Sequence, residues 1–266
     1  MANYIDKEKL TSHITDQNLK FTMLKCLDVV QQVISGYEIK NTKFLNPYET
    51  ENLLSILIGI PEINYHIDGA YEQAERKLVY IYPDYYLPEN IEGNISVIRI
   101  TGNFKYREVS HRDYLGSILS LGITRENIGD ICINKDDVCV ILLSSMKDYI
   151  LYNLEKISNV KIQRTEIKIN ELSYEAPEFE ECIFSVSSLR LDVIIAGALN
   201  LSREKTQSLI KNERVRINYE LVTSVSKLLK ENSIISVKGH GRFIYAEALY
   251  ETKKNKTRVL IRKYRK

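Results

Sequence analysis

His111 and Asp113 are the residues whose types and spacing come nearest to acid–base machinery. An imidazole and a carboxylate two positions apart could move a proton, because histidine titrates near neutral pH. No serine or cysteine nucleophile motif accompanies them. Asp113 also suits the first turn of a helix, where a negative charge is stabilised by the helix dipole. We therefore predict a helix start here and no catalytic residue.

Metal and cofactor chemistry have little support in the sequence. The four cysteines are Cys26, Cys132, Cys139 and Cys182, and no two of them form a C-x-x-C pair of the kind that zinc sites use. Each lies among apolar neighbours, so we expect reduced, mostly buried thiols. No glycine-rich phosphate loop precedes residue 180. We predict neither a metal nor a cofactor.

Cationic side chains concentrate at one end of the chain. Residues 183–266 contain 18 Lys and Arg against 7 Asp and Glu, whereas residues 1–182 contain 19 against 28. The net charge of +2 therefore hides a strongly basic C-terminal third. Such segregation is typical of proteins that bind nucleic acid. No apolar run approaches the roughly 18 residues of a membrane span, and the N-terminus lacks a secretory signal, so a cytoplasmic protein is expected.

Two short helices and a small sheet are predicted between Ser187 and Ala246. Ser188 and Ser202 are good helix caps, and apolar residues follow each at helical spacing. The strands expected after them are Val215–Asn218, Ile234–Lys238 and Phe243–Tyr245, with a glycine turn at residues 239–241.

The polar and cationic residues of this stretch form the predicted binding surface. The free N–H groups and positive dipole end of a helix start suit a phosphate. We expect contacts to an RNA backbone from Arg190, Ser202, Arg203, Lys205, Thr206, Lys211, Arg216, Lys238 and Arg242. Three residues from the middle of the chain join this set: His111, Arg112 and Arg125.

The same stretch resembles the RNA-binding domain first described in ribosomal protein S-four. The matching segments are S-x-R-L-D (188–192), S-R (202–203), L-I-x-x-x-x-V-x-I-N (209–218) and V-K-G-H-G-R-F (237–243). The family usually has glycine where this chain has Glu213 and Tyr219. We expect Asn212 to take the left-handed conformation after the second helix instead.

The rest of the chain predicts an α+β protein. Residues 3–68 indicate helices, residues 69–77 a hinge, and residues 95–168 the order strand–helix–strand–strand–helix–strand of ferredoxin-like and RRM domains. The central strands of that unit lack aromatic residues, so RRM-type base stacking is not expected. We divide the chain into a mainly helical domain (1–74), an RRM-like domain (75–170), an acidic linker (171–182) and an S-four-like domain (183–266).

Four segments together resemble the YlmH family. They are T-K-F-L-N-P-Y-E (42–49), G-A-Y-E-Q-A-E-R-K (69–77), the stretch from His111 to Ile131, and the C-terminal module. The resemblance implies a non-enzymatic, ribosome-associated factor that binds the large ribosomal subunit. It further implies a role in ribosome-associated quality control with the NEMF-like factor RqcH, on subunits that carry peptidyl-tRNA, in support of alanine tailing. Subunit assembly and cell division remain open as other roles, and a monomer is expected.

An RNA-modifying enzyme is the alternative. Pseudouridine synthases carry the same module, and Arg190-Leu191-Asp192 is similar to their R-L-D signature, whose aspartate is catalytic. Here Asp192 falls inside the first predicted helix of the module and not on a separate catalytic sheet. A tyrosyl-tRNA synthetase would need H-I-G-H and K-M-S-K-S type motifs, and the sequence has neither.

Overall fold

The computed structural model describes residues 4–87, 89, 91, 93–104 and 109–264 of the chain. Helices and strands are mixed through the chain, which confirms the predicted α+β class. The chain divides into two units, Met1–Glu175 and Ala176–Lys266. No helix in the described ranges combines the length and the apolar character that crossing a membrane requires.

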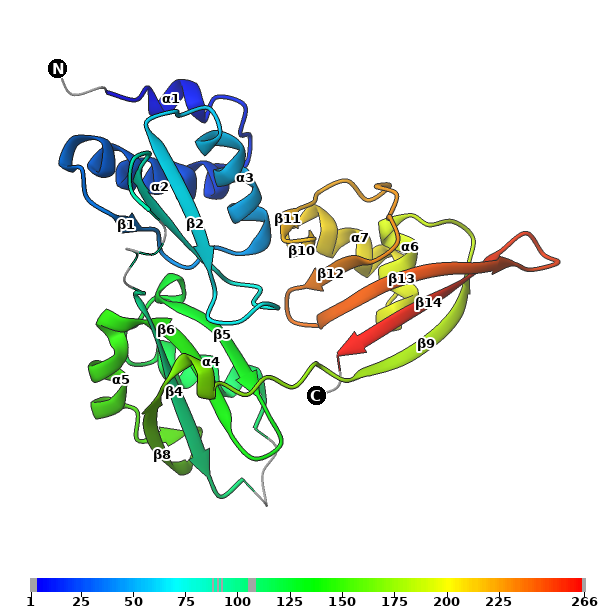
Figure 1. Cartoon of the computed structure of the whole chain (residues 1–266). Helices are drawn as coiled ribbons and strands as arrows, with labels where there is room; N and C mark the ends of the chain where they lie inside the picture. The colour runs from blue at the N-terminus through cyan, green and yellow to red at the C-terminus, as the bar shows by residue number, and fades with distance from the viewer. Residues whose placement is uncertain (1–3, 88, 90, 92, 105–108, 265–266) are drawn as a thin grey trace. The chain divides into compact units, whose positions relative to one another are not determined.

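The first part of the N-terminal unit packs two long helices on a small antiparallel sheet (Figure 1). Its elements are α1 (Lys7–Leu10), α2 (Gln17–Gly36), β1 (Lys40–Asn41), α3 (Pro47–Leu57), β2 (Ile63–Asp68) and β3 (Leu78–Pro83). A capping box begins α3, in which Asn46 and Glu49 exchange hydrogen bonds of 2.8 and 3.0 Å. The prediction of helix up to residue 68 was wrong for β2, whose residues pair with β3.

Strand β3 is buried on both faces. Val79 and Ile81 pack with the core beneath α2 and α3, whereas Leu78 and Tyr80 pack with the core of the following sheet. Successive side chains of a strand point to opposite faces, so one short apolar run serves both cores. The predicted RRM-like domain, residues 75–170, included this segment, but β3 pairs with β1 and β2 in the N-terminal sheet.

The second part of the N-terminal unit has the predicted order of strands and helices. Its elements are β4 (Ile95–Gly102), α4 (His111–Leu119), η2 (Arg125–Asn127), β5 (Ile128–Ile133), β6 (Val138–Leu143), η3 (Ser144–Met146), α5 (Lys147–Asn153), β7 (Lys156–Ile157), β8 (Val160–Ile167) and η4 (Ile169–Glu171). The sheet order is β5-β6-β4-β8-β7, with every pair antiparallel. The second helix of this unit, α5, ends at Asn153, because residues 156–157 form β7 and pair with the start of β8.

Both faces of this sheet are covered. One face carries Ile98 and Leu142, which pack with Ile118 of α4 and Ile150 of α5. The other face carries Val97, Cys139 and Ile141, which pack with Phe44, Leu78 and Tyr80 of the preceding part. The face on which an RRM stacks bases is therefore part of a hydrophobic core. This burial gives a structural reason for the lack of aromatic residues in the central strands.

The C-terminal unit places two helices on one side of a six-stranded sheet (Figure 1). Its elements are β9 (Phe179–Val186), α6 (Leu191–Leu199), α7 (Arg203–Lys211), β10 (Val215–Ile217), β11 (Glu220–Leu221), β12 (Ser233–Val237), β13 (Gly241–Glu251) and β14 (Thr257–Tyr264). The sheet order is β11-β10-β12-β13-β14-β9, all antiparallel.

Strand β9 includes residues that we had assigned to the acidic linker. It pairs with β14 along its whole length, so Glu181 lies opposite Arg262, and the two side chains form an ion pair of 3.0 Å. Acidic residues of the connector thus neutralise part of the last basic strand. The linker prediction was wrong for residues 179–182, and the basic residues 265 and 266 lie outside the described residues.

The two turns that usually contain glycine keep a left-handed backbone here. Glu213 has φ 57° and Tyr219 has φ 70°. Asn212, which we expected to be left-handed, has φ −89° instead. The backbone path of the module is therefore retained without its glycines, at the cost of strain at two side-chain-bearing residues.

Replacing Glu213 with glycine is expected to raise the free energy of unfolding of the C-terminal unit. Relief of left-handed strain outweighs the extra entropy of glycine in the unfolded chain, for a net gain of about 0.5–1 kcal/mol. Urea unfolding measures the change. Asn212→Gly is the matched control, because its ordinary φ offers no strain to relieve and the same substitution there should lower stability. Equal effects of the two substitutions would contradict the prediction.

Candidate nucleic-acid interface

The start of α6 is organised around a buried aspartate. Asp192 is 0% exposed, and its carboxylate accepts two hydrogen bonds from the Arg190 guanidinium, at 3.1 and 3.2 Å. Gln207 of α7 donates to the same carboxylate at 3.2 Å. The cap position is Arg190 and not Ser188, because the helix begins only at Leu191. Asp192 therefore fixes Arg190 in place and ties the two helices together.

The pKa of Asp192 reflects two opposing effects. Burial acts to raise it, but the hydrogen bonds from Arg190 and Gln207 and the positive charges of Arg190 and Arg203 outweigh burial, so the pKa lies below its ordinary value. A depressed folded-state pKa means that the ionised carboxylate stabilises the fold. That stabilisation is complete above the ordinary aspartate pKa of about 4 and is lost as the pH falls through the folded-state value.

The start of α6 is not an open phosphate site. The N–H groups of Leu191 and Asp192 donate to the carbonyl oxygens of Lys227 and Val225, at 2.9 and 3.3 Å. These donors are already used by the loop before β12. Arg190 can still present its guanidinium, since its side chain is 38% exposed.

The start of α7 has the predicted cap and exposed cations. The Ser202 hydroxyl accepts from the Lys205 N–H at 3.2 Å, and Ser202, Arg203 and Lys205 are all exposed. Thr206 is different, because it is 0% exposed and its hydroxyl donates to the Ser202 carbonyl at 3.0 Å. The prediction that Thr206 contacts RNA was wrong, since a residue on the buried face of α7 cannot reach a ligand.

The other predicted contacts do not share one face with α7. Arg216 and Arg242 both lie opposite Ser236, in neighbouring strands. Their neighbours Ile217 and Phe243 belong to the core under α6 and α7, so the two arginines point to the opposite side of the sheet. The predicted contact residues therefore lie on two surfaces of the C-terminal unit and not on one. We call them the helix surface (Arg190, Ser202, Arg203 and Lys205) and the sheet surface (Arg216 and Arg242).

Two further cations lie at the ends of elements. Lys211 is the last residue of α7, and Lys238 follows β12 at the tight turn before β13; both are exposed. The glycine turn itself has the predicted geometry, with φ of 88° at Gly239 and 98° at Gly241. Lys238 thus stands on a turn of defined shape beside the sheet surface.

His111 and Arg112 begin α4 and are exposed. Asp113 accepts hydrogen bonds from the backbone N–H and the hydroxyl of Ser110, at 2.9 and 2.6 Å, and from the Ser158 hydroxyl at 3.3 Å. Its contacts are those of a capping box, as expected for a helix start. The pair that most resembled acid–base machinery is thus a helix terminus with a structural carboxylate.

Arg125 has a structural role. Its guanidinium donates to the carbonyl oxygens of Ile128 and Gly129, at 2.6 and 3.0 Å. Burial and the nearby Arg76 charge lower its pKa to about 10. These contacts support the bulge in β5, where the pairing register shifts between Ile128 and Ile131. We therefore no longer expect Arg125 to contact RNA.

The predicted hinge at residues 69–77 is instead fixed by Asp130. The Asp130 carboxylate accepts from the Tyr71 hydroxyl at 2.9 Å and from the backbone N–H groups of Glu75 and Arg76, at 2.7 and 3.2 Å. Arg76 then donates to the Phe44 and Ile128 carbonyl oxygens. The bulge in β5 directs Asp130 toward this segment. We call Asp130 with these donors the Asp130 hub. Sequence patterns do not predict it, because the donors lie 54 to 59 positions from Asp130.

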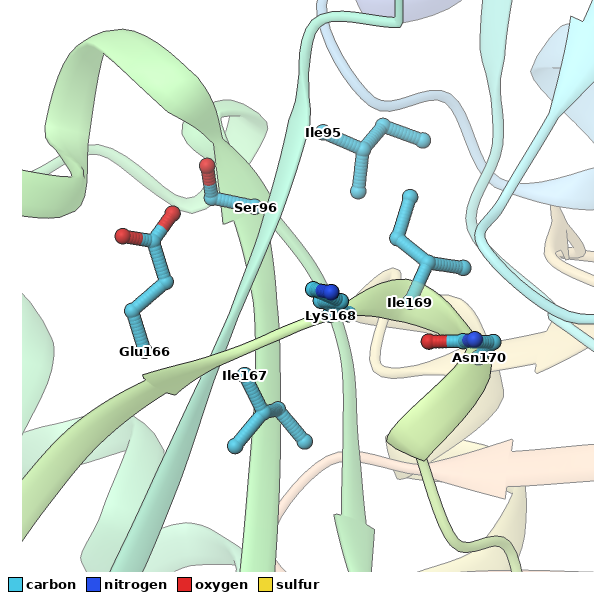
Figure 2. A pocket seen from close by; sticks show the side chains of 7 residues that line it. All are labelled: Ile95, Ser96, Glu166, Ile167, Lys168, Ile169 and Asn170. Carbon is cyan, nitrogen blue, oxygen red and sulfur yellow. The ribbon is translucent and has the colours of Figure 1, made fainter.

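A hollow in the N-terminal unit lies where β4 begins and the antiparallel strand β8 ends (Figure 2). The residues that line it are Ile95, Ser96, Glu166, Ile167, Lys168, Ile169 and Asn170. Glu166 pairs with Lys147 at 3.2 Å, and the Ser96 hydroxyl donates to the Ser144 hydroxyl at 3.0 Å. Its serine and its carboxylate are thus engaged in contacts of their own, and the lining contains no histidine or cysteine.

Comparisons with known proteins point to one family. A family model described as "YlmH, N-terminal" matches residues 20–86, and one described as "Putative RNA-binding domain in YlmH" matches residues 88–171. The chain is 31% identical over 223 residues to "Ribosome-associated protein quality control protein P2" of Bacillus subtilis (strain 168), covering 84% of this chain and 86% of that protein. A solved structure, "Cell division protein ylmH from Streptococcus pneumoniae", is similar at 23% identity and a TM-score of 0.49, over 64% of this chain and 97% of that one.

Proposed function

The chain belongs to the YlmH family, and from this premise we propose that it is an RNA-binding factor of ribosome-associated quality control. The observation that carries the proposal is the helix surface. It presents exposed cations at a capped helix start, beside an arginine that a buried aspartate holds in place. Such a surface suits phosphate groups.

The family and the charge distribution also support a more specific proposal about the domain type and its RNA partners. We propose that the C-terminal unit is an S-four-like domain that binds large-subunit ribosomal RNA and peptidyl-tRNA. The N-terminal unit would then set its orientation and contact tRNA or the RqcH factor, with exposed His111 and Arg112 as candidate contacts. Support for alanine tailing on the ribosome, and a monomeric state, belong to the same proposal.

The RRM-like plan predicted for residues 95–168 is also part of the proposal. The sheet order and the antiparallel pairs support it. Because both faces of the sheet are covered, we propose that this part binds through its edges and helix ends and not by stacking bases on the sheet.

A non-enzymatic role is supported by the site itself. The catalytic aspartate of an RNA-modifying enzyme must reach its substrate, whereas Asp192 is 0% exposed and bound to Arg190 and Gln207. The R-L-D sequence here positions a cation, which is a structural use of the same three residues.

Charge reversal at Arg203 and Lys205 tests the proposed function. The variant Arg203→Glu/Lys205→Glu is expected to bind purified large subunits about tenfold more weakly or worse in co-sedimentation at moderate salt. The slope of log affinity against log salt should flatten by about two, one for each lost phosphate contact. Both residues are exposed, so the fold should be unaffected.

The matched control is Lys253→Glu/Lys254→Glu, which makes the same change in net charge at exposed positions of the β13–β14 hairpin. A general loss of positive charge would weaken both variants equally. The proposal requires a clearly larger loss for the α7 variant, and unchanged co-sedimentation of that variant would refute it.

A further inference from the structure

Tyr219 keeps a backbone conformation that disfavours a side chain. It follows Asn218 in the two-residue turn between β10 and β11, with φ values of 47° and 70°. Asn-Gly is the pair that such a turn prefers. A strained residue that persists where glycine would be relaxed indicates that its side chain contributes something else.

The Tyr219 ring belongs to a row of planar groups. The Arg242 guanidinium carbon lies 5.5 Å from the Tyr219 ring centre and 4.9 Å from that of Tyr264. Arg242 also donates to the Tyr264 hydroxyl at 3.2 Å. Phe179 lies beside Tyr264, with the ring centres 5.0 Å apart and the two rings inclined by 61° in an edge-to-face contact. We call Tyr219, Arg242, Tyr264 and Phe179 the stacking row.

The stacking row crosses the sheet surface, on the side away from α6 and α7. Arg242 of β13 lies opposite Ser236 of β12, and Tyr264 of β14 lies opposite Phe179 of β9. The row therefore follows one line that crosses the strands of the sheet. All four members are partly exposed. The exposed Arg216 lies on the same line, and its guanidinium donates to the Tyr219 carbonyl at 2.9 Å.

We propose that the stacking row binds unpaired bases of RNA. Aromatic rings and arginine planes stack on bases of any sequence, and a pre-arranged row does so with little loss of freedom on binding. Arg216 lies in the middle of β10 and Lys238 directly follows the neighbouring strand β12, so both can contact the phosphates of the same strand of RNA. This inference rests on the proposed RNA binding and adds a second surface, which prefers single-stranded to paired RNA.

The substitution Tyr219→Gly separates binding from folding. It removes the ring, relaxes the turn and retains the carbonyl that accepts from Arg216. In the full chain, affinity for a short single-stranded oligouridylate should fall about tenfold, by the usual size of one base–aromatic stack. Affinity for an RNA duplex of equal length should not change, and the thermal midpoint should not fall. Tyr219→Phe should bind like the unmodified chain.

Each result decides the proposal. Equal oligouridylate affinity of Tyr219→Gly and the unmodified chain would overturn it, and so would an equal loss on the duplex, which would point to charge or to the fold. Arg203→Glu/Lys205→Glu should weaken binding of both RNAs. If the unmodified chain binds neither RNA at low salt, the proposed function itself fails, and the stacking row fails with it.

Discussion

Replacing Asp130 with alanine is expected to lower the free energy of unfolding of the N-terminal unit by about 3 kcal/mol. The substitution leaves two backbone N–H groups and one phenol hydroxyl without their acceptor, and each such half-buried group costs about 1–3 kcal/mol. The lower end of that range applies because Asp130 is only partly buried and water can replace some bonds. Urea unfolding followed by circular dichroism measures the loss.

Asp136→Ala is the matched control for this substitution. Asp136 is an exposed aspartate in the turn between β5 and β6, so its loss should change stability by less than about 0.5 kcal/mol. Hydrogen exchange gives a local readout as well. In Asp130→Ala, the amides of residues 69–77 should exchange much faster, because Glu75 and Arg76 lose their acceptor. Equal urea midpoints of unfolding for Asp130→Ala and Asp136→Ala would show that Asp130 does not fix residues 69–77.

The contacts of Asp130 also illustrate which structural features sequence periodicity cannot predict. Apolar runs and apolar periodicity were sufficient to predict β4, β6, β8 and α7 to within a few residues. Strands β4 and β6 are almost continuous apolar runs buried on both faces, whereas α7 buries one regular set of positions. The same rule cannot show that β5 contains a bulge, and the bulge decides the direction of Asp130. Arg125 was misassigned for the same reason, since its carbonyl partners exist only at that bulge.

Two other misassigned residues lie where the period of the helix or strand places them. Thr206 was assigned to the binding set, although helical spacing places it on the same face of α7 as the buried Leu209 and Ile210. Arg242 precedes Phe243 in β13, so the period of two already places it on the face opposite the core. The stacking row, like the bulge in β5, could not be predicted, because Phe179 and Tyr264 meet through strand pairing over 85 positions of chain.

The helix surface depends on Asp192 in a way that can be tested. Asp192→Ala is expected to lower the free energy of unfolding of the C-terminal unit by about 2–3 kcal/mol. Breaking a buried ion pair costs about 3–5 kcal/mol, and the 38% exposure of Arg190 lets solvent screen part of that cost. The difference in the free energy of unfolding between Asp192→Ala and the unmodified chain should shrink below about pH 4, where protonation of Asp192 removes the same stabilisation.

The same substitution should also weaken RNA binding at a pH and temperature where the protein stays folded. Without the carboxylate, the Arg190 guanidinium is no longer held by two hydrogen bonds, so presenting it to a phosphate costs more conformational entropy. We expect a loss of a few-fold for large subunits in co-sedimentation, comparable with that of Arg190→Met.

A double variant separates the fold from the contact. Arg190→Met/Asp192→Leu replaces the ion pair with apolar side chains of similar size, which is often close to neutral for stability. It should therefore recover most of the stability lost in Asp192→Ala and none of the RNA affinity. If affinity returns together with stability, Asp192 supports only the fold, and Arg190 is not a contact. If stability returns alone, the buried aspartate serves to aim the arginine, which is the role that its bidentate geometry indicates.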